Sequence, residues 1–233
     1  SKNNSSGGKH KVKQGQKPRD GGEGGIDEIR AARLSKVAAM VDADVNPFAY
    51  SFDHSSTTTE LQRNFAHLEN GMEDESADVS IAGRIMLRRI FGKLAFFTLQ
   101  DEVGQVQLYL EKSRIGDSFK HFMDWTDGGD IIGVRGSVKK TDKGEVSVYV
   151  KEWTMLSKAL LPLPDKFHGL TDVSKRYRNR HLDMIANPKV RETFRARALI
   201  TSSMRRMLDD EGYVEIETPI LNDQPGGAEA KPF

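Results

Sequence analysis

Aromatic and amide side chains alternate with aliphatic ones along two short stretches, Ala95 to Leu99 and Gln105 to Leu110. In an extended strand, successive side chains point to opposite faces. Phe96 and Gln107 therefore lie on one face of a strand pair, while the apolar residues on either side of them point inward. Aromatic rings stack on unpaired bases and carboxamides hydrogen-bond to base edges, so this pair could bind a single-stranded nucleic acid.

The segments around this pair predict the small barrel that would hold it. Period-two alternation interrupted by turn residues predicts three strands over 79–110, and two more over 132–138 and 146–150. Helical spacing predicts one helix over 111–124, with an apolar face of Ile115, Phe119, Phe122 and Met123. Three strands, a helix and two strands is the order of an OB barrel, whose exposed strand face binds oligonucleotides. Another small antiparallel barrel or sandwich fits the same alternation.

The overall composition is that of a globular protein without a strong electrostatic field. The chain has 233 residues, is 37% hydrophobic and carries a formal net charge of +1. Any affinity for nucleic acid must then come from local basic clusters and stacking. No apolar run approaches the roughly 20 residues of a membrane helix, so no membrane partner is expected. The absence of cysteine excludes disulfides and thiolate metal sites, and we predict no metal site in this chain.

The first 19 residues form a basic segment without acidic side chains, which predicts disorder. Three interpretations stay open: an arm that holds RNA by charge, the remnant of an organelle-targeting peptide, or a solvated tail. The basic residues are Lys2, Lys9, Lys11, Lys13, Lys17 and Arg19.

Two helices are predicted before the barrel. Helical spacing of apolar residues indicates the first over 26–41. The second begins near Thr59, which forms a plausible capping box with Gln62. We expect both helices to pack on the barrel, with direct RNA contact by Arg30 or Arg33 as the alternative.

A connector and a long helix follow the barrel. The prolines in ALLPLPDKFHGL, residues 159–170, favour extended geometry and a semi-rigid connector. Asn187-Pro188 has the residue types of a helix start, and Gly212 can end that helix. The alternation over 213–217 predicts a short strand, and 224–233 is a glycine-rich loop.

Four stretches resemble, in order and spacing, the lysyl-tRNA synthetase family in its bacterial or organellar form. The segment GYVEIETP, after the long helix, is similar to motif 1 of class II aminoacyl-tRNA synthetases. Aspartyl and asparaginyl synthetases share the barrel and motif 1 but resemble the second and fourth stretches less. The four stretches are GRIMLRRIFGKLAFFTLQD, KALLPLPDKFHGL, RYRNRHLDMIANP and PGGAEAKPF.

The resemblance covers roughly residues 26–233 and implies an α+β fold. N-terminal helices and a five-stranded OB-fold β-barrel would be followed by the start of a class II synthetase antiparallel α/β catalytic domain. The expected division is a basic tail over 1–25, helices over 26–75, an anticodon-binding OB domain over 76–157, a linker over 158–175 and a truncated catalytic domain over 176–233.

The resemblance also assigns roles to five residues of the barrel. Phe96 would stack on an anticodon base, and Gln107 would read the central uridine. Glu145 resembles an anticodon-reading glutamate. Arg88 and Arg89 resemble contacts to the RNA backbone or bases.

In the second half, the resemblance implies a lysine contact by the backbone of Gly227 and a homodimer interface that includes Pro219. It implies no catalytic residue within this chain. ATP and Mg²⁺ would be bound by a C-terminal part carrying motifs 2 and 3.

The implied protein is a lysine–tRNA ligase, with tRNA-Lys, lysine and ATP as partners. This fragment alone would be inactive. The expected compartment is the cytoplasm, with the chloroplast or mitochondrion as the alternative. Two other hypotheses are a stand-alone OB-fold RNA-binding or regulatory module and a fragment of an aspartyl or asparaginyl synthetase.

Overall fold

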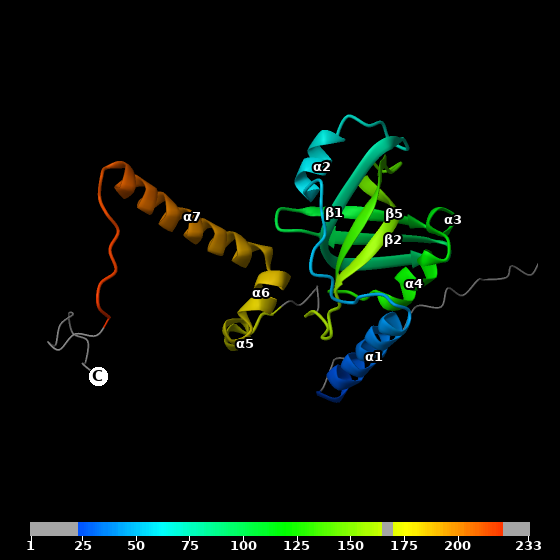
Figure 1. The fold of residues 1–233 in the computed structure, drawn as a ribbon, viewed down its shortest axis with the longest axis horizontal. Coiled ribbons are helices and arrows are strands. Elements are labelled where there is room, and N and C mark those ends of the chain that lie inside the picture. The colour runs from blue at the N-terminus through cyan, green and yellow to red at the C-terminus, as the bar shows by residue number, and fades with distance from the viewer. Residues whose placement is uncertain (1–22, 165–169, 221–233) are drawn as a thin grey trace, which may run out of the picture. The chain divides into compact units, whose positions relative to one another are not determined.

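The computed structural model describes residues 23–164 and 170–220, and the chain divides into two units, Ser1–Leu163 and Pro164–Phe233 (Figure 1). The predictions for the basic segment 1–19 and the glycine-rich loop 224–233 concern residues outside the described ones.

The first unit contains a closed five-stranded barrel, so the predicted OB-type architecture is confirmed (Figure 1). The strands follow one another around the barrel in the order β1-β2-β3-β5-β4. Neighbouring strands are antiparallel, except that β3 and β5 are parallel. The strands are β1 (Glu73–Phe91), β2 (Leu94–Gln100), β3 (Gln105–Glu111), β4 (Ile131–Lys140) and β5 (Val146–Ser157).

The barrel core follows the alternation of the sequence. Ala95, Phe97 and Leu99 of β2 are buried, and so are the alternate residues of β3. Phe122, from the helical segment between β3 and β4, packs its ring 5.0 Å from that of Phe97, centroid to centroid. Burying such side chains stabilises the fold by about 1.5–3 kcal/mol each. Phe96, between two buried residues, is left on the outer surface.

The helix predicted over 111–124 is in fact two, α3 (Lys112–Ile115) and α4 (Ser118–Trp125). The prediction of one helix is wrong because Gly116 adopts φ 58° and ends α3. This left-handed conformation carries little penalty for glycine, which has no Cβ. Ile115 and Phe119 are nevertheless both buried, so the apolar face read from the sequence survives the break.

Helix α2 (Thr58–Asn64) begins one residue before Thr59, the residue predicted to cap it. The capping box is formed by Thr57 and Glu60 instead. Thr57 Oγ1 accepts from Glu60 N at 3.3 Å, and Thr57 N donates to Glu60 Oε2 at 2.9 Å. The predicted pair of Thr59 and Gln62 lies two residues too far along the chain. Residues 57–59 are all threonine, and each is a possible N-cap.

Helix α1 (Glu23–Asp42) is tied to the barrel by Arg33, which is only 8% exposed. Its guanidinium donates to the carbonyl oxygens of Ala159 at 2.6 Å, Leu161 at 2.9 Å and Gly128 at 3.1 Å. The alternative of RNA contact by Arg33 is therefore wrong, because these three carbonyls occupy its guanidinium. The residue fixes the start of the connector to α1 and to the loop before β4.

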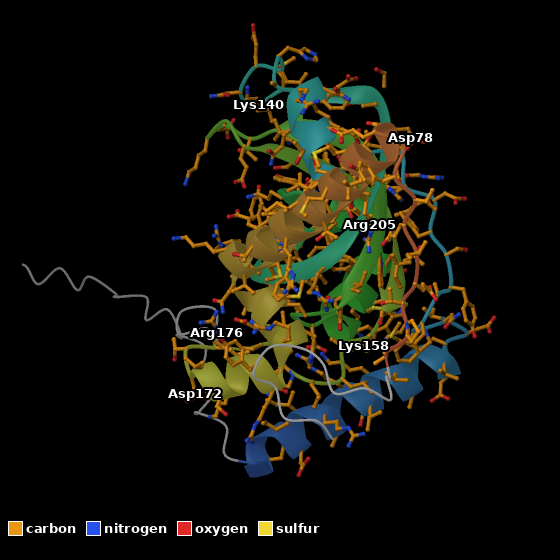
Figure 2. The ribbon with its side chains drawn as sticks, turned by 90° about the vertical axis from the view of Figure 1, so that its left-hand side faces the viewer. Asp78, Lys140, Lys158, Asp172, Arg176 and Arg205 are labelled. Carbon is orange, nitrogen blue, oxygen red and sulfur yellow. The ribbon has the colours of Figure 1, made fainter. Side chains whose placement is uncertain are left out.

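A buried ionic cluster lies beside this clamp. The side chain of Lys158 is fully buried, and its Nζ lies 2.5 Å from Asp127 Oδ2 and 2.7 Å from Asp130 Oδ2 (Lys158 is labelled in Figure 2). Asp127 also pairs with Lys36 at 2.8 Å. Burial by itself would raise the pKa of Asp127, but hydrogen bonds from Lys158 and Lys36 outweigh it and hold that pKa below its usual value.

The second unit consists of α5 (Val173–Arg178), α6 (Arg180–Ala186) and α7 (Pro188–Asp210) in its described part. The buried carboxylate of Asp183 joins α5, α6 and the start of α7. It accepts from Arg176 Nε at 3.0 Å, from Arg180 Nη1 at 2.5 Å and from Asn187 Nδ2 at 2.6 Å. Asn187 is the N-cap residue of α7, as predicted, although its side chain bonds to Asp183 rather than to the helix backbone.

Helix α7 ends at a glycine motif. Gly212 has φ 86°, its N–H donates to Asp209 O at 3.0 Å, and Tyr213 N donates to Leu208 O at 3.0 Å. These two bonds form a Schellman cap. The strand predicted over 213–217 is not formed, because no segment among residues 170–220 pairs with it. An isolated strand leaves its backbone N–H and C=O groups unpaired.

Candidate nucleic-acid interface

A row of rings crosses the outer face of the barrel on three neighbouring strands, β2, β3 and β5. Phe96 lies opposite Tyr109, and Tyr109 lies opposite Tyr149. Their ring centroids are 5.1 Å and 4.9 Å apart, with interplanar angles of 85° and 82°. Such edge-to-face pairs are favourable because the positive edge of one ring meets the negative face of the next. We call Phe96, Tyr109 and Tyr149 the aromatic row.

A polar row lies two residues away along the same strands. Thr98, Gln107 and Ser147 face one another across β2, β3 and β5. Gln107 Nε2 donates to Glu145 Oε2 at 2.6 Å, and Gln107 Oε1 accepts from Ser147 Oγ at 3.2 Å. Both ends of the Gln107 amide are thus oriented. Gln107 and Glu145, predicted from different strands, are in direct contact.

The aromatic row is covered at its Tyr149 end. The guanidinium of Arg114 lies 3.8 Å from the centroid of the Tyr149 ring, and Arg114 also pairs with Glu73 at 2.7 Å. The Tyr149 hydroxyl donates to Glu111 Oε2 at 2.5 Å. Burial, together with this bond to a carboxylate, raises the pKa of Tyr149 to about 12. The Tyr149 ring is therefore covered and supports its neighbour Tyr109. The accessible rings of the aromatic row are those of Tyr109 and Phe96.

Two cations accompany the row. Lys139 Nζ lies 4.8 Å from the ring centroid of Tyr109 and 5.1 Å from that of Tyr149. Arg89 is exposed and lies opposite Phe96 in the β1–β2 register. Cations placed around stacking rings can bind the phosphates between successive bases.

The predicted role of Arg88 does not fit its position. Arg88 lies opposite the buried Phe97 rather than Phe96, and its guanidinium is 5.2 Å from the Phe97 ring centroid. Its Nη2 donates to Met123 O at 2.9 Å, and its Nη1 lies 3.6 Å from Asp127 Oδ1. Burial lowers the pKa of this guanidinium. The assignment of Arg88 to RNA is corrected accordingly: its partners are the end of α4 and the ionic cluster.

Two further predicted site residues belong to the second unit. Pro219 is exposed after the end of α7, and its place in a dimer interface stays a prediction. Gly227 lies outside the described residues. Within residues 23–164 and 170–220, no cluster of three or more His, Cys, Asp or Glu side chains could hold a metal ion, and no helix is long and apolar enough to span a membrane.

The sequence prediction omitted Tyr149 and Lys139 from the site. Both could have been found from strand alternation. Val148 and Val138 are predicted to face inward, so the residues that follow them, Tyr149 and Lys139, must face outward. The capping of Tyr149 by Arg114 had no such signal, because Arg114 belongs to α3 and meets β5 only in the folded barrel.

Comparison with known protein families assigns both units. Residues 79–156 match the family described as OB-fold nucleic acid binding domain, and residues 172–233 match the class II tRNA synthetases for D, K and N. The chain thus combines an OB-fold nucleic-acid-binding domain with a segment of a class II synthetase.

Its relatives identify which synthetase. Lysine–tRNA ligases from Nostoc punctiforme and Thermosynechococcus vestitus are 55% and 54% identical over 215 and 211 residues. The chloroplastic/mitochondrial lysine–tRNA ligase of Arabidopsis thaliana is 50% identical over 210 residues. These matches cover 89%, 88% and 89% of the chain but only 38%, 42% and 35% of the relatives' length. The chain belongs to the lysyl-tRNA synthetase family, as its motifs predicted, and spans about two fifths of the length of these relatives.

Proposed function

We propose that the barrel binds the anticodon of tRNA-Lys, as the recognition domain of a lysine–tRNA ligase that charges this tRNA with lysine at the expense of ATP. One observation carries the proposal. Phe96, the accessible end of the aromatic row, lies one row away from the contacting pair of Gln107 and Glu145.

Affinity and selectivity would come from different side chains. Base–aromatic stacking contributes about 1–3 kcal/mol per base and tolerates any base, so Phe96 supplies affinity. Selectivity comes from Gln107 and Glu145, which offer an amide donor and a carboxylate acceptor. The Watson–Crick edge of uridine has an N3–H donor between two carbonyl acceptors and can satisfy both. A base with the wrong pattern leaves one of these groups unpaired, at a cost of about 1–3 kcal/mol.

The remaining parts of the enzyme are assigned by family membership. ATP and Mg²⁺ are proposed to be bound by a C-terminal part of the enzyme that carries motifs 2 and 3. The backbone of Gly227 is proposed to contact lysine. The proposed domains are those expected from the sequence, with the OB domain over 76–157, the linker over 158–175 and the catalytic segment from residue 176.

The proposed homodimer interface comprises Pro219 and the apolar stripe of α7. This stripe is exposed along the helix at Phe194, Met204 and Leu208. The proposed compartment is the cytoplasm. A chloroplast or mitochondrion is the alternative that the plant relative's name suggests.

Binding of anticodon stem-loops tests the central proposal. Fluorescence anisotropy would compare Phe96→Ala with the unmodified chain, using stem-loops with the two lysine anticodons and the aspartate anticodon at one salt concentration. Phe96→Ala should weaken lysine stem-loop binding by about 1–3 kcal/mol, since an outward ring is lost. Phe48→Ala is the matched control, because Phe48 is also exposed in the first unit but lies outside the aromatic row.

The thermal midpoint of each variant separates binding from folding. Phe96→Ala should unfold near the temperature of the unmodified barrel, since Phe96 is not part of the buried core. Unchanged affinity in Phe96→Ala, or a preference for the aspartate stem-loop, would overturn the proposed function.

A further inference from the structure

The turn between β1 and β2 exposes a second ring beside the aromatic row. Phe91 is 63% exposed, and its ring centroid lies 6.2 Å from that of Phe96 at an interplanar angle of 70°. In the β1–β2 register Phe91 lies opposite Leu94, two residues before Phe96 on β2. Because side chains two apart share a face, Phe91 belongs to the same outer surface as Phe96.

Along the line of rings, the outer surface continues past Phe96 toward Phe91. At the opposite end, Arg114 covers Tyr149, so no further base can stack there. Past Phe96 in the other direction, the next ring is Phe91, which ends the β1 strand just before Gly92. A single strand that leaves Phe96 in this direction would therefore pass over Phe91.

The charge around Phe91 suits a nucleic acid strand. The segment RRIFGK, residues 88–93, contains no carboxylate, and two of its three cationic side chains are exposed. Arg89 is exposed on the same outer face, and Lys93 is exposed in the turn. The carboxylate on the neighbouring strand, Glu111 opposite Leu94, is engaged by the Tyr149 hydroxyl. Cations on both sides of an exposed ring provide phosphate contacts around a stacked base.

We propose that Phe91 is a second stacking platform, which binds the base adjacent to the one stacked on Phe96. The ligand is a single-stranded RNA nucleotide flanking the central anticodon position, and the contact is by stacking rather than by base-edge hydrogen bonds. Phe91 would then add affinity without adding sequence selectivity. This inference rests on the proposed function, since it extends the same RNA strand by one nucleotide.

The test combines protein variants with abasic RNA. Lysine anticodon stem-loops would lack the base at the central position, at the position 5′ to it or at the position 3′ to it. Phe91→Ala should weaken binding of the intact stem-loop about tenfold. Removal of one flanking base should weaken binding to the unmodified chain by a similar factor. The same base removal should have little further effect on Phe91→Ala, because the two changes remove the same contact.

Two further variants define what the ring contributes. Phe91→Trp should retain affinity, because it keeps a stacking surface. Ile90→Ala is the matched control, since Ile90 is 48% exposed in the same turn but has the opposite parity, facing Ala95 rather than Phe96. It should bind intact RNA as the unmodified chain does.

Failure of this inference can be distinguished from failure of the proposed function. If Phe96→Ala weakens binding but Phe91→Ala does not, Phe91 is not a platform and the anticodon proposal stands. If neither variant changes affinity, both proposals fall. Equal losses of RNA affinity in Phe91→Ala and Ile90→Ala would mean that Phe91 acts through the turn and not on a base. The same conclusion would follow if the loss of affinity in Phe91→Ala added to the loss from each of the two flanking abasic positions.

Discussion

Replacement of Lys158 by methionine tests how the start of the connector is held to the barrel. The change removes one positive charge from a fully buried site while keeping a similar volume. Asp130, also fully buried, would lose the ammonium at 2.7 Å and keep the backbone donors Asp127 N at 2.6 Å and Ala159 N at 2.8 Å. Breaking a buried ion pair by removing one partner costs about 3–5 kcal/mol. The thermal midpoint should fall by about 10 °C, from roughly 2–4 °C per kcal/mol for a chain of this size.

The pH dependence of the stability lost in Lys158→Met identifies the cause of that loss. In the unmodified chain the pKa of Asp127 is lowered on folding. The stabilisation that Asp127 contributes to the free energy of unfolding is therefore present above its unfolded pKa and is lost as pH falls through its folded pKa. Without Lys158, Asp127 loses a hydrogen bond of 2.5 Å, one of the interactions that lower its pKa. The stabilisation that the variant lacks is therefore present above the unfolded pKa and is lost as pH falls through the folded pKa. The two proteins should differ most near neutral pH and converge only below the unfolded pKa of an aspartate, about 3.9.

Chemical denaturation at several pH values would measure this, with Lys36→Met as the control. Lys36 also pairs with Asp127, but its side chain is 29% exposed, so its loss should cost about 1 kcal/mol or less. The electrostatic reasoning would be refuted by a Lys158→Met deficit below about 1 kcal/mol at neutral pH, or by a large deficit that does not change with pH.

Two other substitutions test the recognition pair and the barrel wall. Glu145→Gln should leave the thermal midpoint unchanged, because its bond to Gln107 is exposed, but should reduce discrimination between uridine and cytidine at the central anticodon position by about 1–2 kcal/mol. Anisotropy with the two stem-loops measures this, with Glu152→Gln, also exposed on β5, as control. Gly136→Ala should destabilise the barrel by about 2–4 kcal/mol, because the added Cβ would clash with the backbone oxygen of Tyr149. Denaturant unfolding against Gly128→Ala, where a Cβ meets nothing within 4 Å, would show whether that clash is real.

The barrel and most of its binding face could be predicted because period-two patterning is a local signal. Strand parity alone placed Phe96 outside and its neighbours inside, before any partner strand was known. The contact between Gln107 and Glu145 could not be predicted in this way, since it depends on the parallel register of β3 and β5, which are 35 or more residues apart. Strand parity places Gln107 on the outer face, family resemblance adds Glu145, and only the structure shows that the two are in contact.

Three features that the sequence missed have separate physical causes. The capping box of α2 moved from Thr59 to Thr57 because three consecutive threonines are equivalent candidates until the chain before them is placed. The break at Gly116 kept the apolar face while changing the helix path. The strand after Gly212 requires a partner strand that residues 170–220 do not provide.

The different positions of Arg88 and Arg89 come from one irregularity in β1. Up to Ile85, the odd-numbered residues of this strand face the core, so continued alternation would bury Arg89 and expose Arg88. Between Ile85, opposite Leu99, and Leu87, opposite Thr98, the register shifts by one residue. A bulge of this kind reverses the facing of every later side chain in the strand.

The reversal determines what the outer face can bind. After the bulge, Arg88 turns toward the buried Phe97 and the ionic cluster, while Arg89 and Phe91 come out beside Phe96. Without the extra residue, Arg88 and Ile90 would take the outer positions of Arg89 and Phe91, so the outer face would lose one ring on the side that extends past Phe96. The bulge in β1 is therefore the backbone feature that makes a second stacking position next to Phe96 possible, and the RNA contacts proposed for this end of the barrel depend on it.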